Sequence, residues 1–400
     1  MGSSSAILRR WMSSISVEGV DYFNANRISP WLMLPPVLDG IGNIAYKFHC
    51  LANQELHYKN KIGGGELQLA ADIDNIEFVG SSHGWLALQS RQNYDDLFLS
   101  NPIIDRHIKL PTLGALGPAN RLILSSSLSP EEEEDEPLAL MNCRSNSKLA
   151  FCSPRRRTEW TVLGSDRDYT YQNLVYSSRH KRLFCVRRPY YNGNICLECW
   201  DVVRRQRDWV IQDCNELSFG GWTYTEYSQL NYLVCAEDTG DLFLVVRHVN
   251  PRVGPYGSMV DKVILCKDRG SLLTRNPYKT IDFDVYKIDV DGGKVDMYME
   301  DSLQGLAMFV GINHPFVIPA AEVSGVMPDS VYFTDENDLV EQTKHEPTTG
   351  YGGHDNGIFD YRNKDFYKCC DLYPIEYEKI TRILPPPLWF TPQCPKQHLC

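Results

Sequence analysis

Short stretches of alternating hydrophobic and polar residues dominate the chain, and each is bounded by Gly, Pro, Asn, Asp or Ser. This period-two pattern is typical of half-buried antiparallel strands. Outside the first 25 residues, no long window has the three-and-four spacing of an amphipathic helix. We therefore expect an all-β protein with a short helical or disordered segment at its N-terminus.

The predicted strands fall into repeated units of four. The clearest unit, about 40 residues long and the size of one propeller blade, has strands at Ile76–Gly80, Trp85–Gln89, Asp96–Ser100 and Arg106–Leu110. Further units of the same plan begin at Arg121, Asn173, Tyr232 and Ala307. The pattern therefore predicts a β-propeller, with two stacked β-sandwich domains as the alternative.

Strand-like pieces at the two ends of the chain complete the count. Pairing of the strand at Trp31–Leu34 with a strand near Pro385–Thr391 would close the ring and remove its exposed edges. The prediction is a single propeller of about six four-stranded blades over residues 29–392, between an N-terminal segment 1–28 and a tail 393–400.

Five motifs occur in a fixed order along the chain. They are Ser29-Pro30-Trp31-Leu32-Met33-Leu34-Pro35, Gly80-Ser81-Ser82-His83-Gly84-Trp85-Leu86, Asn101-Pro102, Tyr332-Phe333-Thr334-Asp335 and Pro386-Pro387-Leu388-Trp389-Phe390. In this order they resemble the plant F-box proteins with a kelch-like β-propeller, a family catalogued as a domain of unknown function (number 295). The resemblance implies a propeller that holds a target protein, while an F-box before it docks the Skp-type adaptor of a cullin-based ubiquitin ligase.

The 28 residues before the Ser29-Pro30-Trp31 motif do not resemble an F-box. The sequence therefore predicts an unknown target protein as partner, but it does not predict docking of a Skp-type adaptor. Residues Met1–Val17 contain no acidic side chain, are rich in Ser and include Arg9-Arg10. This composition also fits an organellar transit peptide, so an organelle-targeted propeller without an F-box is an alternative.

Composition narrows the classes of partner and compartment. The formal net charge is -11 and no basic stripe is visible, so we expect no binding to nucleic acid. No stretch approaches the roughly 18 consecutive apolar residues of a membrane span. Thirteen cysteines without a secretory signal favour reduced thiols. We expect a soluble protein of the cytoplasm or nucleus, or of an organelle if the N-terminus is a transit peptide.

Candidate chemistry is sparse. Gly80–Gly84 fits a Gly-x-Ser-x-Gly nucleophile elbow, but the elbow must lead into a helix and Trp85–Leu88 is a predicted strand. The less favoured alternative is a hydrolase that uses the propeller channel, with His83 and a carboxylate as acid and base. Cys196 and Cys199 lie three apart on a predicted strand and so face opposite ways, which disfavours a shared metal ion. We expect no catalytic residues, no metal and no cofactor.

Loops are the best candidates for partner binding, because a rigid scaffold commonly presents binding residues on its connections. The segment from Gly220 to Tyr227 is aromatic without strand alternation, and Trp222, Tyr224 and Tyr227 are its predicted contact residues. An insertion from Asn250 to Lys279 is the second candidate. Arg155 and Arg156 are the predicted basic contact residues. The sequence thus predicts a non-catalytic protein-binding propeller.

Overall fold

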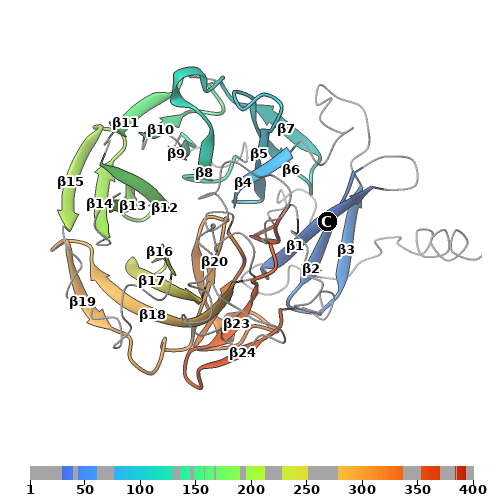
Figure 1. Cartoon of the computed structure of the whole chain (residues 1–400), viewed down its shortest axis with the longest axis vertical. Helices are drawn as coiled ribbons and strands as arrows, with labels where there is room; N and C mark the ends of the chain where they lie inside the picture. The colour runs from blue at the N-terminus through green and yellow to red at the C-terminus, as the bar shows by residue number, and fades with distance from the viewer. Residues whose placement is uncertain are drawn as a thin grey trace, which may run out of the picture.

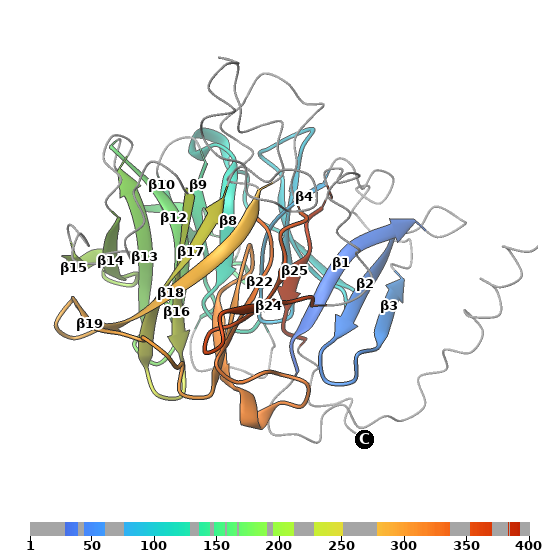
Figure 2. The same ribbon diagram turned by 60° about the horizontal axis from the view of Figure 1, so that its bottom comes forward.

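The fold is described from a computed structural model of the chain. The structure describes residues 29–38, 44–60, 76–128, 136–144, 148–156, 158–165, 168–189, 195–211, 228–250, 278–336, 353–369, 383 and 385–392. These residues form strands β1 to β25 and two short 3-10 helices, η3 (Gly114–Leu116) and η7 (Ala320–Glu322). Figure 1 shows the strands arranged as blades around a ring in chain order, and Figure 2 shows them running between the two ends of the ring.

Blades 2, 3 and 4 are regular four-stranded antiparallel meanders. Blade 2 contains β4 (Ile76–Ser82), β5 (Trp85–Ser90), β6 (Leu97–Asn101) and β7 (Arg106–Lys109). Blade 3 contains β8 (Ala119–Leu124), β9 (Ala139–Cys143), β10 (Lys148–Cys152) and β11 (Thr161–Ser165). Blade 4 contains β12 (Tyr169–Ser177), β13 (Arg182–Pro189), β14 (Cys196–Asp201) and β15 (Gln206–Ile211). The repeated units predicted from alternation are confirmed here.

Blade 1 joins the two ends of the chain. It contains β25 (Leu388–Phe390), β1 (Trp31–Leu38), β2 (Ile44–Cys50) and β3 (Leu56–Asn60), in that order from the ring centre. β1 pairs antiparallel with β25, with Trp31 opposite Phe390 and Met33 opposite Leu388. The predicted closure of the ring is therefore confirmed.

Blades 5 and 6 share one nine-stranded sheet. Blade 5 contains β16 (Ser228–Ala236), β17 (Asp241–Asn250), β18 (Lys279–Asp289) and β19 (Lys294–Tyr298). Blade 6 contains β20 (Leu306–Val310), β21 (Phe316–Pro319), β22 (Ser330–Phe333), β23 (Gly357–Asp360) and β24 (Asp365–Tyr367). β21 meets β16 through one parallel bridge, from Cys235 to Phe316. Blade 6 differs from the other blades in that two of its strands, β20 and β22, pair in parallel.

The hydrophobic core is divided among the contacts between blades. Six buried clusters occur in the described residues, and each combines side chains from two neighbouring blades. Leu32 of blade 1, for example, shares a cluster with Tyr332 of blade 6. Burial of these apolar faces is the main force holding the blades together. Because every neighbouring pair has its own cluster, the six blades form a closed ring.

The Gly80–Gly84 motif is a hairpin, as predicted. β4 ends at Ser82 and β5 begins at Trp85, so His83 and Gly84 form a two-residue turn with positive φ values of 50° and 76°. Two positive φ values are typical of a type I′ hairpin turn. A Cβ atom on Gly80 would lie 2.0 Å from the carbonyl oxygen of Leu122 in blade 3. The glycine therefore allows two inner strands to approach closely.

Candidate functional site

The tip of the β20–β21 hairpin, residues 311–315, reaches three other blades. The backbone N–H of His314 donates to the Ser81 carbonyl in blade 2 at 2.7 Å. The Arg121 guanidinium of blade 3 donates to the Gly311 carbonyl at 2.5 Å, and the Tyr176 N–H of blade 4 donates to the His314 ring. A segment of blade 6 that contacts blades 2, 3 and 4 lies at the centre of the ring, as Figure 1 shows.

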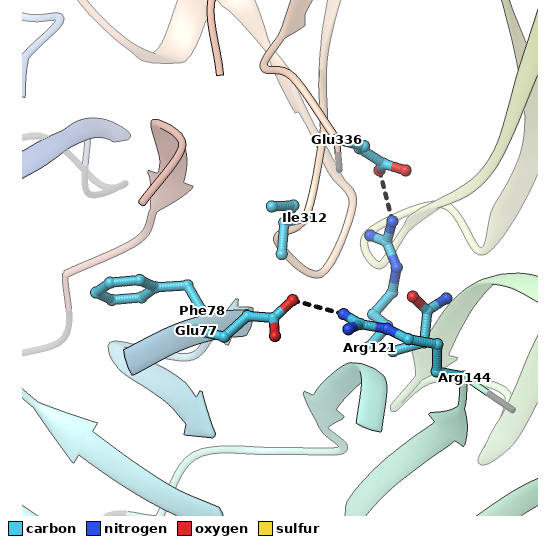
Figure 3. Close-up of a pocket in the computed structure, with 7 residues that line it drawn as sticks. Glu77, Phe78, Arg121, Arg144, Ile312 and Glu336 are labelled. Carbon is cyan, nitrogen blue, oxygen red and sulfur yellow. Dashed lines mark hydrogen bonds and ion pairs between the residues drawn. The ribbon is translucent and has the colours of Figure 1, made fainter. Parts of the chain in front are cut away.

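A small pocket lies beside this tip, at the end of the ring that we call the pocket end (Figure 3). It is lined by Glu77, Phe78, Asn120, Arg121, Arg144, Ile312 and Glu336. Arg121 Nη2 donates to Glu336 Oε1 at 2.5 Å, and Arg144 Nη2 donates to Glu77 Oε1 at 2.5 Å. The pocket has a volume of about 20 Å³, which is room for about one water molecule or the end of a side chain.

The two ion pairs of the pocket differ in burial. Arg121 and Glu336 are each 4% exposed, whereas Arg144 and Glu77 are 20% and 10% exposed. A fully buried pair needs further hydrogen bonds to offset desolvation, and the bonds from Arg121 to the Gly311 and Asn313 carbonyls provide them. The buried pair of Arg121 and Glu336 links blade 3 to blade 6 at the ring centre. Arg144 and Glu77 are more exposed, so a ligand that enters the pocket would contact these charges first.

A buried polar network between blades 5 and 6 lies near the pocket end. Arg247 donates to Thr280 Oγ1, the Thr334 carbonyl and Asp355, while the Tyr278 hydroxyl donates to Asp335 at 2.5 Å. Burial opposes the charge on Arg247, but Tyr232, Asp355 and Asp335 outweigh it and raise its pKa. Burial is also the main cause that raises the pKa of Asp335. Part of the Tyr332–Asp335 motif therefore fastens two blades together.

The described residues that flank four long segments lie toward the pocket end. These segments are 61–75, 212–227, 251–277 and 337–352, and they lie outside the described residues. Their described neighbours include Glu77 and Glu336, which line the pocket, and Tyr278, whose hydroxyl bonds to Asp335 beside Glu336. Ser228 pairs with Val249, which places the start of β16 level with the end of β17. The longest connections of the ring thus attach at one end.

The structure describes only two of the predicted contact residues. Trp222, Tyr224 and Tyr227 lie outside the described residues, between β15 and β16. Arg155 and Arg156 are exposed in the β10–β11 turn, at the other end of the ring, and Arg156 Nε lies 3.3 Å from Glu136 Oε2. These arginines therefore cannot belong to the same site as the pocket.

The surroundings of His83 do not match an acid–base pair. Its ring lies 5.9 Å from that of His314, and its Nε2 has no hydrogen-bond partner among the described residues. The Glu237 carboxylate acts on it only through its charge. Burial is the main cause that lowers the pKa of His83 to about 4 and the pKa of His314 to about 3. Both imidazoles are therefore neutral at physiological pH, and the structure adds no support for a hydrolase in the channel.

The remaining sequence-based candidates concern metal binding and membrane insertion. Cys196 and Cys199 are both buried in β14, and burial raises the pKa of Cys199 to about 12. Within the described residues, no group of three His, Cys, Asp or Glu side chains is placed to hold a metal ion. In the same part of the chain, no helix has both the length and the hydrophobicity needed to cross a membrane.

A closed ring of β-blades with a polar pocket at its centre defines the class of protein as a β-propeller. The family model described as "KIB1-4 beta-propeller" matches residues 57–360. The chain therefore belongs to the KIB1-4 β-propeller family, the plant F-box-associated propellers that its motifs resemble. Propellers of this family are typically the substrate-binding part of plant F-box proteins.

A search of curated protein sequences finds no match. Among solved structures, hydrazine synthase of Kuenenia stuttgartiensis matches with a TM-score of 0.36 and 14% identity, over 76% of each chain. A chain of a nidogen/laminin complex matches at 0.35 and 9% identity, over 68% of this chain and 92% of that one. The Dos1 propeller matches at 0.31 and 9%, over 55% and 57%. At these TM-scores the similarities say nothing about what this chain binds.

The pocket residues are the part of the site that sequence reasoning missed. Glu77 and Arg144 are 67 residues apart in the chain, and Arg121 and Glu336 are 215 apart. Each is an ordinary charged residue within or just after a predicted strand. The position of Glu336 directly after the Tyr332–Asp335 motif is the single local hint in the sequence.

Proposed function

We propose that this propeller holds a partner protein at the pocket end and performs no chemistry on it. The observation that carries the proposal is that the described residues flanking four long segments lie at the same end of the ring as one polar pocket, in a family whose propellers are typically substrate-binding parts. The aromatic residues Trp222, Tyr224 and Tyr227 belong to one of these segments. Rigid aromatic side chains are frequent energetic anchors of protein interfaces.

The chemistry of the pocket supports a binding role. Its lining offers the guanidinium of Arg144, the carboxylate of Glu77 and the amide of Asn120, which together can donate and accept hydrogen bonds. Among the described residues, the lining contains no Ser, Cys or His, and its two carboxylates, Glu77 and Glu336, are each paired with an arginine. A side chain with a polar end fits such a pocket, while the surrounding loops would provide most of the interface area.

The proposal is tested by affinity purification of the tagged chain from plant cells, followed by mass spectrometry and binding of the purified partner. Two variants address the pocket end: Asn120→Gln, whose extra methylene occupies the pocket without removing a charge, and Trp222→Ala with Tyr224→Ala. We expect both to weaken binding of the same partner by tenfold or more, about 1.4 kcal/mol.

Arg106→Glu is the matched control, because Arg106 is exposed in β7 and lies outside the pocket. It should leave the affinity within about twofold of wild type. Recovery of a Skp-type adaptor and cullin together with the partner would identify a ligase receptor, and a partner alone would identify a stand-alone binding module. Unchanged affinity in both pocket-end variants would refute this placement of the site.

A further inference from the structure

The turns at the other end of the ring differ in charge from blade to blade. In blades 3 and 4 they carry a set of exposed cations, which we call the basic turn surface: Arg155, Arg156, Arg179, Lys181, Arg204 and Arg205. The neighbouring turns of blade 5 carry Glu237, Asp238, Asp289 and Asp291. A chain with a net charge of -11 therefore gathers six cations on two adjacent blades.

Side-chain contacts place these turns beside one another. The guanidinium carbon of Arg205, in the β14–β15 turn, lies 6.0 Å from the ring centre of Phe151, in β10 of blade 3. Arg182 connects the β12–β13 turn to the β14–β15 turn, because its side chain reaches both Asp201 and Asp208. The turns that carry Arg155, Lys181 and Arg204 thus form one continuous surface.

An exposed apolar residue lies within this surface. Val203 is 84% exposed, and every other large hydrophobic residue counted as exposed in the described chain is at most 46% exposed. Its neighbour Val202 is 1% exposed and supplies the core contact of this turn. Val203 therefore contributes little to folding, yet it places a hydrocarbon side chain directly beside Arg204 and Arg205.

We propose that the basic turn surface binds an acidic segment of a partner protein, with an apolar side chain of that segment against Val203. Arginine is suited to this partner because its planar guanidinium forms paired hydrogen bonds with carboxylates. Carboxylates among and beside these cations, including Glu136, Asp208 and Glu237, divide the positive surface into short stretches. A short acidic peptide can contact one such stretch, whereas a nucleic-acid backbone binds along a longer run of cations, so the surface favours the peptide. This second interface does not depend on the one at the pocket end.

The test measures fluorescence anisotropy of the full chain with a short labelled peptide of alternating Glu and Asp around one central Leu. We expect saturable binding that weakens strongly at roughly 0.5 M salt, because exposed charges are screened there. Replacing both Arg204→Glu and Arg205→Glu should lower the affinity about tenfold, and Val203→Ser should lower it less. Arg155→Glu with Arg156→Glu is the second charge-reversal pair, so the test does not depend on one variant folding.

The matched control reverses two exposed charges elsewhere, Arg106→Glu in blade 2 and Lys294→Glu in blade 5, and should leave affinity within about twofold. A peptide with Gln and Asn in place of Glu and Asp should not bind. Equal binding of the two peptides, or equal losses in the control and the Arg204–Arg205 variant, would overturn the proposal. Tighter binding of a labelled oligonucleotide than of the acidic peptide would also overturn it.

Discussion

Residues of the Gly80–Gly84 motif make hydrogen bonds and ring contacts that join neighbouring blades at the ring centre. Ser82 Oγ accepts a hydrogen bond from the Leu124 N–H at 2.8 Å, which links blade 2 to blade 3. His83 occupies the hairpin turn, and its ring faces that of His314. The motif that first resembled a nucleophile elbow is therefore explained by how two blades and a hairpin tip meet.

The two histidines make stability depend on pH. In the unfolded chain both bind a proton near pH 6.5, whereas burial lowers the folded pKa of His83 to about 4 and of His314 to about 3. The unfolded state therefore holds more protons between these values, and the free energy of unfolding falls as the pH drops below about 6.5. Each unit of pKa difference corresponds to about 1.4 kcal/mol.

Urea unfolding at pH 7 and pH 5 measures this loss. We expect His83→Asn with His314→Gln to lose less stability between these pH values than the wild type does. Asn tolerates the positive φ at position 83, and Gln can still accept the Tyr176 N–H bond at position 314. An identical pH dependence in the variant and the wild type would contradict the explanation.

At the scale of elements, the β20–β21 hairpin distinguishes this ring from a set of equal blades. Its strand β20 pairs in parallel with β22. Its tip, residues 311–315, accepts hydrogen bonds from the Arg121 guanidinium at the Gly311 and Asn313 carbonyls. Glu336, just after β22, completes the charge pair. One side chain from blade 3 thus holds two connections of blade 6.

A double-mutant cycle on Arg121 and Glu336 tests this role. Arg121→Met should cost about 3–5 kcal/mol, because it leaves the Glu336 carboxylate buried without its partner. Adding Glu336→Met should recover much of the loss, although the Gly311 and Asn313 carbonyls still lack their donor. The cycle is measured by urea unfolding.

The exposed pair Lys109 and Asp96 is the control for this cycle. Their nitrogen and oxygen lie 2.8 Å apart, but Lys109 is 57% exposed, so its coupling should stay below about 1 kcal/mol. Additive effects of Arg121→Met and Glu336→Met would show that the central pair is not coupled.

For the whole molecule, closure of the ring depends on a short strand near the C-terminus. β25 covers the edge of β1, which would otherwise expose unpaired backbone groups. Trp389 is fully buried, and its ring centre lies 5.1 Å from Phe309 and 5.6 Å from Tyr332 in blade 6. The last strand, β25, therefore pairs with β1 within blade 1 and packs against blade 6, which closes the ring.

Two truncations compare closed and open rings. Removal of residues 385–400 deletes Leu388, Trp389 and Phe390, and the loss of one large buried side chain alone costs about 3–5 kcal/mol. We expect this truncation to unfold or aggregate, measured by size-exclusion chromatography and thermal unfolding. Removal of residues 393–400 leaves β25 intact and should keep the melting temperature within a few degrees. Equal melting temperatures in both truncations would contradict closure by β25.

The sequence alone determined the strands of blades 1 to 5, the grouping of strands into blades and the pairing of the two chain ends. The strands and their grouping are local features, because alternation with period two and turn residues at strand ends act within a few neighbours. The pairing of the chain ends could be predicted because a closed ring leaves no exposed strand edge. Only the tertiary structure decided the parallel direction of β20, the partners of Arg121 and Arg144, and which turns share an end of the ring. Those features join residues as far as 215 positions apart, and a charged residue carries no local mark of the partner it will meet.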